Sequence, residues 1–310
     1  MRIDIVGAGA IGLLFAGELS AAGHNVHLWT RTEEQADWIN RHGIELEHHN
    51  GLRNTVKTGI EAGVLSRGWA EKAEGSAWVL LAVKQRHLTS GLLDSLAFIK
   101  ESHVPVVCLQ NGMGHLDRLA SYLSRDQLYA AVTTEGAKKL SANQVIRSNP
   151  GQTRLGSPFE ADPVKLTEIA DVLGQAGFGA QVAKDIEREM HRKLLMNAAI
   201  NPLTALWRIP NGELLTSEYR RGALEGLISE ALAIYERLGI PYDADIGEQI
   251  KEVCRTTSGN ISSMLADVQR GEETEVDFIN GYLVEMAGKA GMSAPAHEWV
   301  WRLIKGLSNT

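Results

Sequence analysis

The sequence contains few cysteines, and the two present, Cys108 and Cys254, lie far apart in apolar-patterned segments without a CxxC partner. We therefore expect neither a disulfide framework nor a zinc site, and we expect a reducing, cytoplasmic setting. No other cluster of His, Cys and carboxylate residues stands out in the sequence, so we expect no metal ion.

Long apolar runs and basic blocks are also missing. No uninterrupted apolar stretch reaches the roughly 20 residues that cross a bilayer, and no export signal precedes residues 3–6, so we expect neither membrane insertion nor export. The formal net charge of -7 and the pI near 5.8 argue against nucleic-acid binding, which needs a basic face. The chain of 310 residues is otherwise ordinary globular material, long enough for two domains.

Short apolar runs alternate with amphipathic segments over the first half of the chain. The runs span 3–6, 26–29, 78–83, 104–109 and 129–132. This alternation predicts an α/β fold in which a Rossmann-type parallel sheet is covered by crossover helices on both faces. Residues 145–146 and 153–155 flank the turn sequence 148–151, which predicts a hairpin; a helix over 163–175 and a strand near 180–183 are expected next.

Only helical periodicity remains after about Asp185. The expected helices span 187–206, 218–238, 243–257, 261–270, 276–290 and 296–307, with loops at 239–241 and 291–295. The sequence thus predicts an α/β domain over residues 1–184, followed by an all-helical domain over residues 185–310.

The strongest local motif is the GxGxxG sequence Gly7-Ala8-Gly9-Ala10-Ile11-Gly12, which follows the first apolar run and leads into a helix. Its first glycine permits a tight turn, its second lets the backbone approach a pyrophosphate, and its third lets helix and strand pack closely. The helix start then offers N–H groups and a positive dipole end to phosphates. Because a strand precedes the motif and a helix follows it, dinucleotide binding is favoured over a merely flexible glycine loop.

The residue that distinguishes NAD from NADP is expected at the end of the second strand. The strand over 26–29 runs toward Arg31, and no acid is there to bind a free ribose 2′-hydroxyl. The Arg31 guanidinium suits a 2′-phosphate, although a solvated surface arginine is the alternative. Lys84 follows the strand over 78–83, at the sheet edge where ligands bind, and is the second candidate cation.

Polar residues at two further places suggest ligand contacts. Asn111 closes the strand over 104–109, where an ordinary turn asparagine is an equal alternative. Lys193, Asn197 and Asn201 are spaced i, i+4 and i+8, so they fall within about 80° of arc on one helix face. In apolar surroundings this stripe predicts a ligand; the alternative is a solvated lysine with asparagines that bond to neighbouring helices. Pro202 is expected to kink or end the helix.

Motifs along almost the whole chain together resemble the ketopantoate reductase (2-dehydropantoate 2-reductase) family. They are the GxGxxG motif, QNGMG at 110–114, HRKL at 191–194, NPLTA at 201–205, NGEL at 211–214, NISSM at 260–264 and EVDFING at 275–281. The resemblance implies a Rossmann domain joined to a helical domain, with the active site in the cleft between them. It also implies NADPH-dependent reduction of 2-dehydropantoate, a 2-oxo acid, to pantoate in pantothenate and coenzyme A biosynthesis.

The resemblance further implies roles for single residues. Lys193 matches the general acid, and Glu275 matches the substrate-binding carboxylate beside it. The substrate-binding positions match Asn111, Asn197, Asn201, Asn260 and Ser263, with Asn260 one turn before Ser263 on one helix face. The positions that bind NADPH or NADP+ match Gly7, Ala8, Gly9, Ala10, Ile11, Gly12, Arg31, Lys84, Asn111, Ala137 and Glu275. Gln110 and residues 133–137 depart mildly from the family pattern, which leaves the substrate range open.

The chemistry needs few groups beyond these. Hydride addition to the C2 carbonyl develops negative charge on its oxygen, which Lys193 can stabilise and protonate while Glu275 orients Lys193. From the residues alone, Glu275 could equally be an acid that caps a surface helix. The alternatives are a related NADPH-dependent reductase of another 2-oxo acid and a non-catalytic NADP(H) sensor, which has no need of an acid. Trp299, Trp301 and Leu303 fit packing within the chain, the commoner use, or a homodimer interface.

Overall fold

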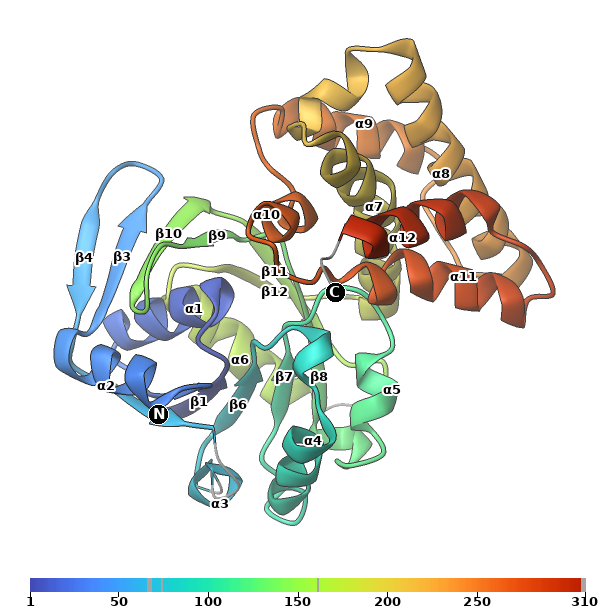
Figure 1. Ribbon diagram of the computed structural model, residues 1–310. Helices are drawn as coiled ribbons and strands as arrows, with labels where there is room; N and C mark the ends of the chain where they lie inside the picture. Colours follow the sequence, from blue (N-terminus) through green and yellow to red (C-terminus); the bar gives the residue numbers. More distant parts are fainter. Residues whose placement is uncertain (66–68, 74, 161, 308–310) are drawn as a thin grey trace. The chain divides into compact units, whose positions relative to one another are not determined.

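The computed structural model describes residues 1–65, 69–73, 75–160 and 162–307 (Figure 1). The described chain divides into two compact units. The α/β unit comprises Met1–Gln110 and His115–Glu187, and the helical unit comprises Asn111–Gly114 and Arg188–Thr310. Among the described residues, we find no helix with the length and apolarity that a membrane span requires.

The α/β unit is built on a main sheet with the strand order β12-β11-β8-β7-β6-β1-β2-β5. The strands are β1 (Arg2–Val6), β2 (Asn25–Thr30), β5 (Ile60–Val64), β6 (Trp78–Leu81), β7 (Val106–Cys108), β8 (Leu128–Thr133), β11 (Gln152–Gly156) and β12 (Gly179–Val182). Neighbours are parallel except for β11 and β8, which pair antiparallel. The strand β6 is buried along its whole length, as in a sheet covered on both faces. The predicted α/β class is confirmed.

A second sheet in the same unit has the strand order β4-β3-β10-β9. Its strands are β3 (Ile44–His48), β4 (Arg53–Val56), β9 (Gly136–Lys139) and β10 (Gln144–Asn149). The strand β3 pairs parallel with β10 and antiparallel with β4, and β10 pairs antiparallel with β9. The apolar runs of the sequence do not predict this sheet, because β4 and β9 are short and carry mainly polar or small residues.

The hairpin expected around residues 148–151 is wrong. Its two strands, β10 and β11, belong to different sheets: β10 pairs with β9 and β3, whereas β11 pairs with β8 and β12. The chain passes between the sheets at Gly151, where a Cβ would lie 2.4 Å from the carbonyl carbon of Thr134. Long-range pairing therefore overrides the local turn signal.

The helices of the α/β unit connect these strands. They are α1 (Ala10–Ala21), α2 (Glu33–His42), α3 (Trp69–Ala73), α4 (Ser90–Leu96), α5 (His115–Leu119) and α6 (Pro163–Gln175), with 3-10 turns at Gln85–His87, Ala97–Ile99 and Arg125–Gln127. The helix α1 contacts β1 and β2 of the main sheet and also β3, β9 and β10 of the second sheet. A helix enclosed in this way is apolar around most of its circumference, and Phe15 in α1 stacks on Phe178 with 4.1 Å between ring centroids.

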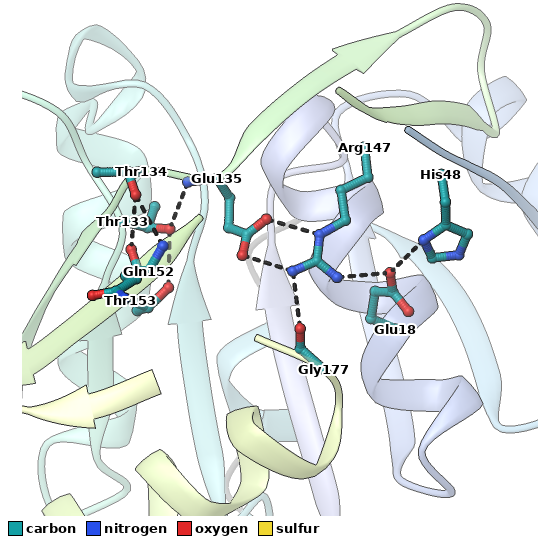
Figure 2. Close-up of polar contacts among 9 residues, drawn as sticks. All are labelled: Glu18, His48, Thr133, Thr134, Glu135, Arg147, Gln152, Thr153 and Gly177. Carbon is teal, nitrogen blue, oxygen red and sulfur yellow. Dashed lines mark hydrogen bonds and ion pairs between the residues drawn. The ribbon is translucent and has the colours of Figure 1, made fainter. Parts of the chain in front are cut away.

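A buried ionic cluster joins the second sheet to α1 (Figure 2). Arg147 on β10 donates to Glu135 from Nε and Nη2 at 2.8 and 2.7 Å, and its Nη2 also donates to the carbonyl of Gly177 at 3.0 Å. Its Nη1 lies 3.4 Å from Glu18 Oε1 on α1, which is 3.6 Å from His48 Nδ1. Burial raises the pKa of Glu18, while His48 and Arg147 act in the opposite direction. The cluster fixes the chain directly before β9.

The helical unit contains α7 (Ile186–Trp207, which begins in the α/β unit), α8 (Glu218–Leu238), α9 (Ile246–Thr256), α10 (Ser263–Gln269), α11 (Asn280–Lys289) and α12 (Pro295–Leu307), with 3-10 turns η4 (Asn211–Leu215) and η5 (Val276–Phe278). Its core gathers large side chains from these helices, among them Leu195, Leu224 and Tyr235. Trp301 packs within the chain, where its Nε1 donates to Asp277 at 2.7 Å, whereas Trp299 and Leu303 are exposed.

The helix α7 spans Ile186–Trp207, within one residue of the expected 187–206, and it does not end at Pro202. The helix expected over 276–290 is interrupted at Ile279, where η5 gives way to α11. Neither Pro nor Gly stands at residue 279 itself, but the Asn280-Gly281 pair directly after the break is a sequence typical of turns.

Candidate active site

The glycine loop joins β1 to α1 in a conformation that depends on its glycines. Gly7 has φ of +109°, and a Cβ there would lie 2.7 Å from Val83 Cγ1. A Cβ on Gly12 would lie 1.7 Å from the carbonyl oxygen of Gly7. At Gly9, by contrast, no described atom lies within 4 Å of the Cβ position. The loop is therefore tightly packed on the protein side and open at its middle glycine.

The start of α1 is available to an anion. The first N–H groups of a helix have no partner within it, and in the described chain no side chain caps α1 at Gly9. The carbonyl oxygen of Ala8 accepts two hydrogen bonds, from Gln35 Nε2 and from Lys139 Nζ, each at 3.0 Å. No motif in the sequence indicates that Gln35 or Lys139 lies near the glycine loop. In the structure, Lys139 brings a positive charge to that loop.

The register of the main sheet brings the other cofactor candidates to the same edge. Val6 at the end of β1 is level with Trp29 on β2 and with Leu81 on β6, so the residues that follow these three strands share one edge. Arg31, after β2, is exposed, and Lys84, after β6, is half-buried. Ala137 lies on β9 of the second sheet, two residues before Lys139.

In the helical unit, Lys193 on α7 lies near Glu275, which is buried at the start of η5. Burial lowers the pKa of Lys193 from 10.5 to about 8, although the Glu275 carboxylate acts in the opposite direction. Asn111 Nδ2 donates to Glu275 Oε2 at 3.3 Å. The structure thus brings together a lysine whose pKa is lowered, a carboxylate and an amide.

Asn111 reaches Glu275 because its turn packs onto η5. The Met113 N–H donates to the carbonyl of Phe278 at 3.0 Å. Gly112 has φ of +79°, and a Cβ there would lie 2.3 Å from the same Phe278 oxygen, so only glycine fits. The turn at 111–114 therefore belongs to the helical unit, although β7 of the α/β unit precedes it by only two residues.

The remaining α7 residues are placed as the spacing predicts, on the same helix. Asn201 is buried, and Asn197 is half-buried. Within the described chain the Asn197 side chain makes no hydrogen bond, which leaves it available to a ligand. One turn further, Thr204 Oγ1 lies 2.7 Å from Ser262 Oγ and so ties α7 to the start of α10.

The helix face expected to carry both Asn260 and Ser263 is wrong. Asn260 lies in the loop before α10, and the helix begins only at Ser263, which is exposed. The physical reason is the cap: Ser262 takes extended backbone angles and its Oγ accepts from the Leu265 N–H at 3.1 Å. Ser262, which the sequence does not single out from its neighbour, is thus the residue that starts this helix.

The structure also places the candidate metal ligands and the two cysteines. Within the described ranges, no group of three His, Cys, Asp or Glu side chains could hold a metal ion. Cys108 and Cys254 are both buried free thiols, and burial raises the pKa of each.

Comparisons with known proteins agree over the full chain. The family model described as "Ketopantoate reductase PanE/ApbA" matches residues 3–158, and "Ketopantoate reductase PanE/ApbA C terminal" matches residues 185–308. The 2-dehydropantoate 2-reductase of Bacillus subtilis is 33% identical over 307 residues, covering 99% of this chain and 97% of that protein. The protein of the same name from Vibrio cholerae is 30% identical over 312 residues, covering 100% and 99%.

Solved structures extend the likeness to three dimensions. The crystal structure of a probable 2-dehydropantoate 2-reductase from Bacillus subtilis has a TM-score of 0.81 at 31% identity, covering 99% of this chain and 100% of that one. The ternary structure of D-mandelate dehydrogenase with NADH and anilino(oxo)acetate has a TM-score of 0.90 at 22% identity, covering 99% and 98%. At that identity the second likeness shows a shared fold alone.

Proposed function

The chain belongs to the ketopantoate reductase family, and from that premise we propose that it reduces 2-dehydropantoate to pantoate with NADPH, using Lys193 as general acid. The observation that carries the proposal is the placement of Lys193 beside Glu275, with Asn111 bonded to the same carboxylate. A reductase needs such an acid where its substrate binds, whereas a protein that only senses a nucleotide does not.

The α/β unit fits a dinucleotide. The open space at Gly9 and the uncapped start of α1 suit a pyrophosphate, which Lys139 would help to neutralise. Arg31 would bind the 2′-phosphate and Lys84 would add a second positive charge at the same sheet edge. When bound, NADPH supplies the hydride that adds to C2 of the substrate.

The helical unit fits a 2-oxo acid that carries a hydroxyl group. Ser263 and Asn260 would donate hydrogen bonds to the substrate carboxylate, and the amides of Asn197 and Asn201 would line the same side. The buried Glu275 carboxylate would accept a hydrogen bond from the substrate hydroxyl. Substrates without that hydroxyl would make one hydrogen bond fewer to this buried carboxylate, which favours 2-dehydropantoate over simpler 2-oxo acids.

Lys193 would complete the reaction. As the hydride adds to C2, negative charge develops on the carbonyl oxygen, and the Lys193 ammonium stabilises that charge and transfers a proton from Nζ to it. Because its pKa is about 8, roughly nine-tenths of Lys193 is protonated at pH 7. Solvent then returns the proton to the neutral amine before the next turnover.

The test of the proposed activity is a steady-state assay with NADPH and 2-dehydropantoate, run beside pyruvate and 2-oxoisovalerate, which lack the hydroxyl. We expect kcat/KM for 2-dehydropantoate to be the highest of the three by at least about 100-fold. Equal or better turnover of either of the others would overturn the named substrate and leave the reductase class standing.

The test of the acid is Lys193→Ala, which we expect to lower kcat at least about 100-fold with the affinity for NADPH little changed. The matched control is Lys251→Ala, a lysine on α9 of the same unit that pairs with Glu225 and Glu248 at 2.8 and 3.0 Å. A Lys193→Ala variant with near wild-type kcat would remove Lys193 from this role.

A further inference from the structure

Pro202 leaves a carbonyl group of α7 without its usual helix partner. Proline has no N–H, so the carbonyl oxygen of Ala198, four residues earlier, cannot accept the helical hydrogen bond. In this structure Asn280 Nδ2 donates to that oxygen at 2.9 Å. Both residues are completely buried. A side chain from the first residue of α11 thus replaces a missing hydrogen bond inside α7.

Asn280 is itself held in place. Its Nδ2 lies 3.0 Å from Nδ1 of the buried His297, and His297 Nε2 lies 3.0 Å from the carbonyl oxygen of Leu227. Burial lowers the pKa of His297, which favours the neutral ring; its Nε2–H then donates to Leu227 while Nδ1 accepts from Asn280. The backbone N–H of His297 donates to Glu230 at 2.8 Å. Asn280 is therefore anchored to both α8 and α12.

The bond from Asn280 to Ala198 joins the two segments that carry Lys193 and Glu275. Ala198 directly follows Asn197 on the helix of Lys193. Asn280 follows Glu275 by five residues, and the intervening turn is closed by the Phe278 N–H, which donates to the Glu275 carbonyl at 3.0 Å. A slide of α7 along its axis would break the bond and would change the separation between Lys193 and Glu275.

We propose that Asn280 is a positioning residue that sets the separation between the Lys193 ammonium and the Glu275 carboxylate. The inference rests on the proposed function, in which Lys193 donates the proton and Glu275 accepts a hydrogen bond from the substrate hydroxyl. Misplacement of a catalytic group by about 1 Å can lower a rate by about 100-fold. Asn280 acts through the backbone of α7 and needs no contact with the substrate.

The experiment combines Asn280→Ala with Pro202→Ala. Alanine at 202 restores an N–H that can donate to Ala198 in the ordinary helical way, so the carbonyl no longer needs Asn280. We expect Asn280→Ala alone to lower Tm by about 5 °C, because a buried carbonyl loses its donor. We expect it to lower kcat at least about 10-fold with the Kd for NADPH unchanged.

The double variant distinguishes two roles of Asn280: positioning Lys193 relative to Glu275, and supplying a hydrogen-bond donor to the Ala198 carbonyl. We expect Asn280→Ala/Pro202→Ala to regain most of the lost Tm while its kcat stays low, because the tie between the two segments is still cut. Recovery of kcat together with Tm would overturn the proposal, as would a wild-type kcat in Asn280→Ala. If Asn280→Ala alone does not fold, the double variant carries the test.

A matched control is Asn143→Ala in the α/β unit, which removes another buried amide that donates to a backbone carbonyl, that of Gly43 at 2.8 Å. We expect it to lower Tm by a similar amount and to leave kcat unchanged. Absence of wild-type turnover with 2-dehydropantoate would instead count against the proposed function. In that case the inference is tested by the pH dependence of the rate at which Lys193 is acylated, measured by peptide mass spectrometry. A changed separation from Glu275 should shift the midpoint of this profile, so the same midpoint in the double variant and in the wild type would overturn the inference.

Discussion

The pH dependence of the reaction should report the environment of Lys193. A general acid works only when protonated, and burial lowers the pKa of this lysine to about 8. The reactive form therefore predominates below pH 8 and is lost as the pH rises through that value. We expect kcat/KM for the 2-oxo acid to be flat from about pH 6 to 7 and to fall about tenfold per unit above about pH 9.

Replacement of Glu275 by glutamine should shift this alkaline limb in a defined direction. The Glu275 carboxylate raises the pKa of Lys193, so its removal lowers that pKa further. A nearby opposite charge is worth about 1 to 3 pKa units, and the Glu275 effect is the smaller of the two causes acting on Lys193. We therefore expect the midpoint to fall from about 8 to about 7, so that about one-tenth of Lys193 is protonated at pH 8 instead of about half.

The assay is the initial rate of NADPH oxidation at saturating NADPH, measured over about pH 6 to 10 for the wild type and for Glu275→Gln. Glu225→Gln is the control, because that carboxylate pairs with Lys251 instead, and its limb should stay in place. A Glu275→Gln limb that stays fixed or moves to higher pH would contradict the electrostatic argument. A wild-type midpoint near 10.5 would mean that the titrating group is an ordinary lysine.

Three further substitutions test the nucleotide site. Gly12→Ala places a Cβ 1.7 Å from the Gly7 oxygen, so we expect loss of NADPH binding and a lower Tm in thermal denaturation. The control is Gly222→Ala on α8, where the Cβ position has open space around it and the substitution should be tolerated. Arg31→Ala should raise the Kd for NADPH at least about tenfold and that for NADH little; an equal effect in fluorescence titration would show that it does not bind the 2′-phosphate. Lys139→Met should weaken both nucleotides by about the same factor, because its ammonium lies at the glycine loop; discrimination between them would instead place it at the 2′-phosphate.

The parts of the fold that the sequence predicts are those with local causes. The glycine motif requires its turn, and the helices over 163–175 and 218–238 have the predicted bounds because caps and turn residues mark both ends. No local sequence feature of this kind predicts the second sheet. Its strand β3 pairs with β10, about a hundred residues later, and no pattern within either segment encodes that partner.

The site divides in the same way. The stripe of Lys193, Asn197 and Asn201 follows from helical spacing alone. Glu275 does not, because one acid before a break in a helix resembles any surface cap, and only the family resemblance singles it out. Lys139 and Asn280 each donate to a carbonyl oxygen far away in the sequence, so the roles proposed for them become visible only when the chain is folded.

The turn at Asn111–Gly114 has a consequence for how this protein is made and divided. Although it leaves the ribosome with the α/β unit, it completes the helical unit through Met113 and Phe278. The helical unit therefore cannot be inherited or excised as one uninterrupted stretch: a chain starting at Arg188 would lack the amide that meets Glu275. Gene fusion or recombination at the apparent boundary would separate Asn111 from Glu275, its hydrogen-bond partner in the helical unit.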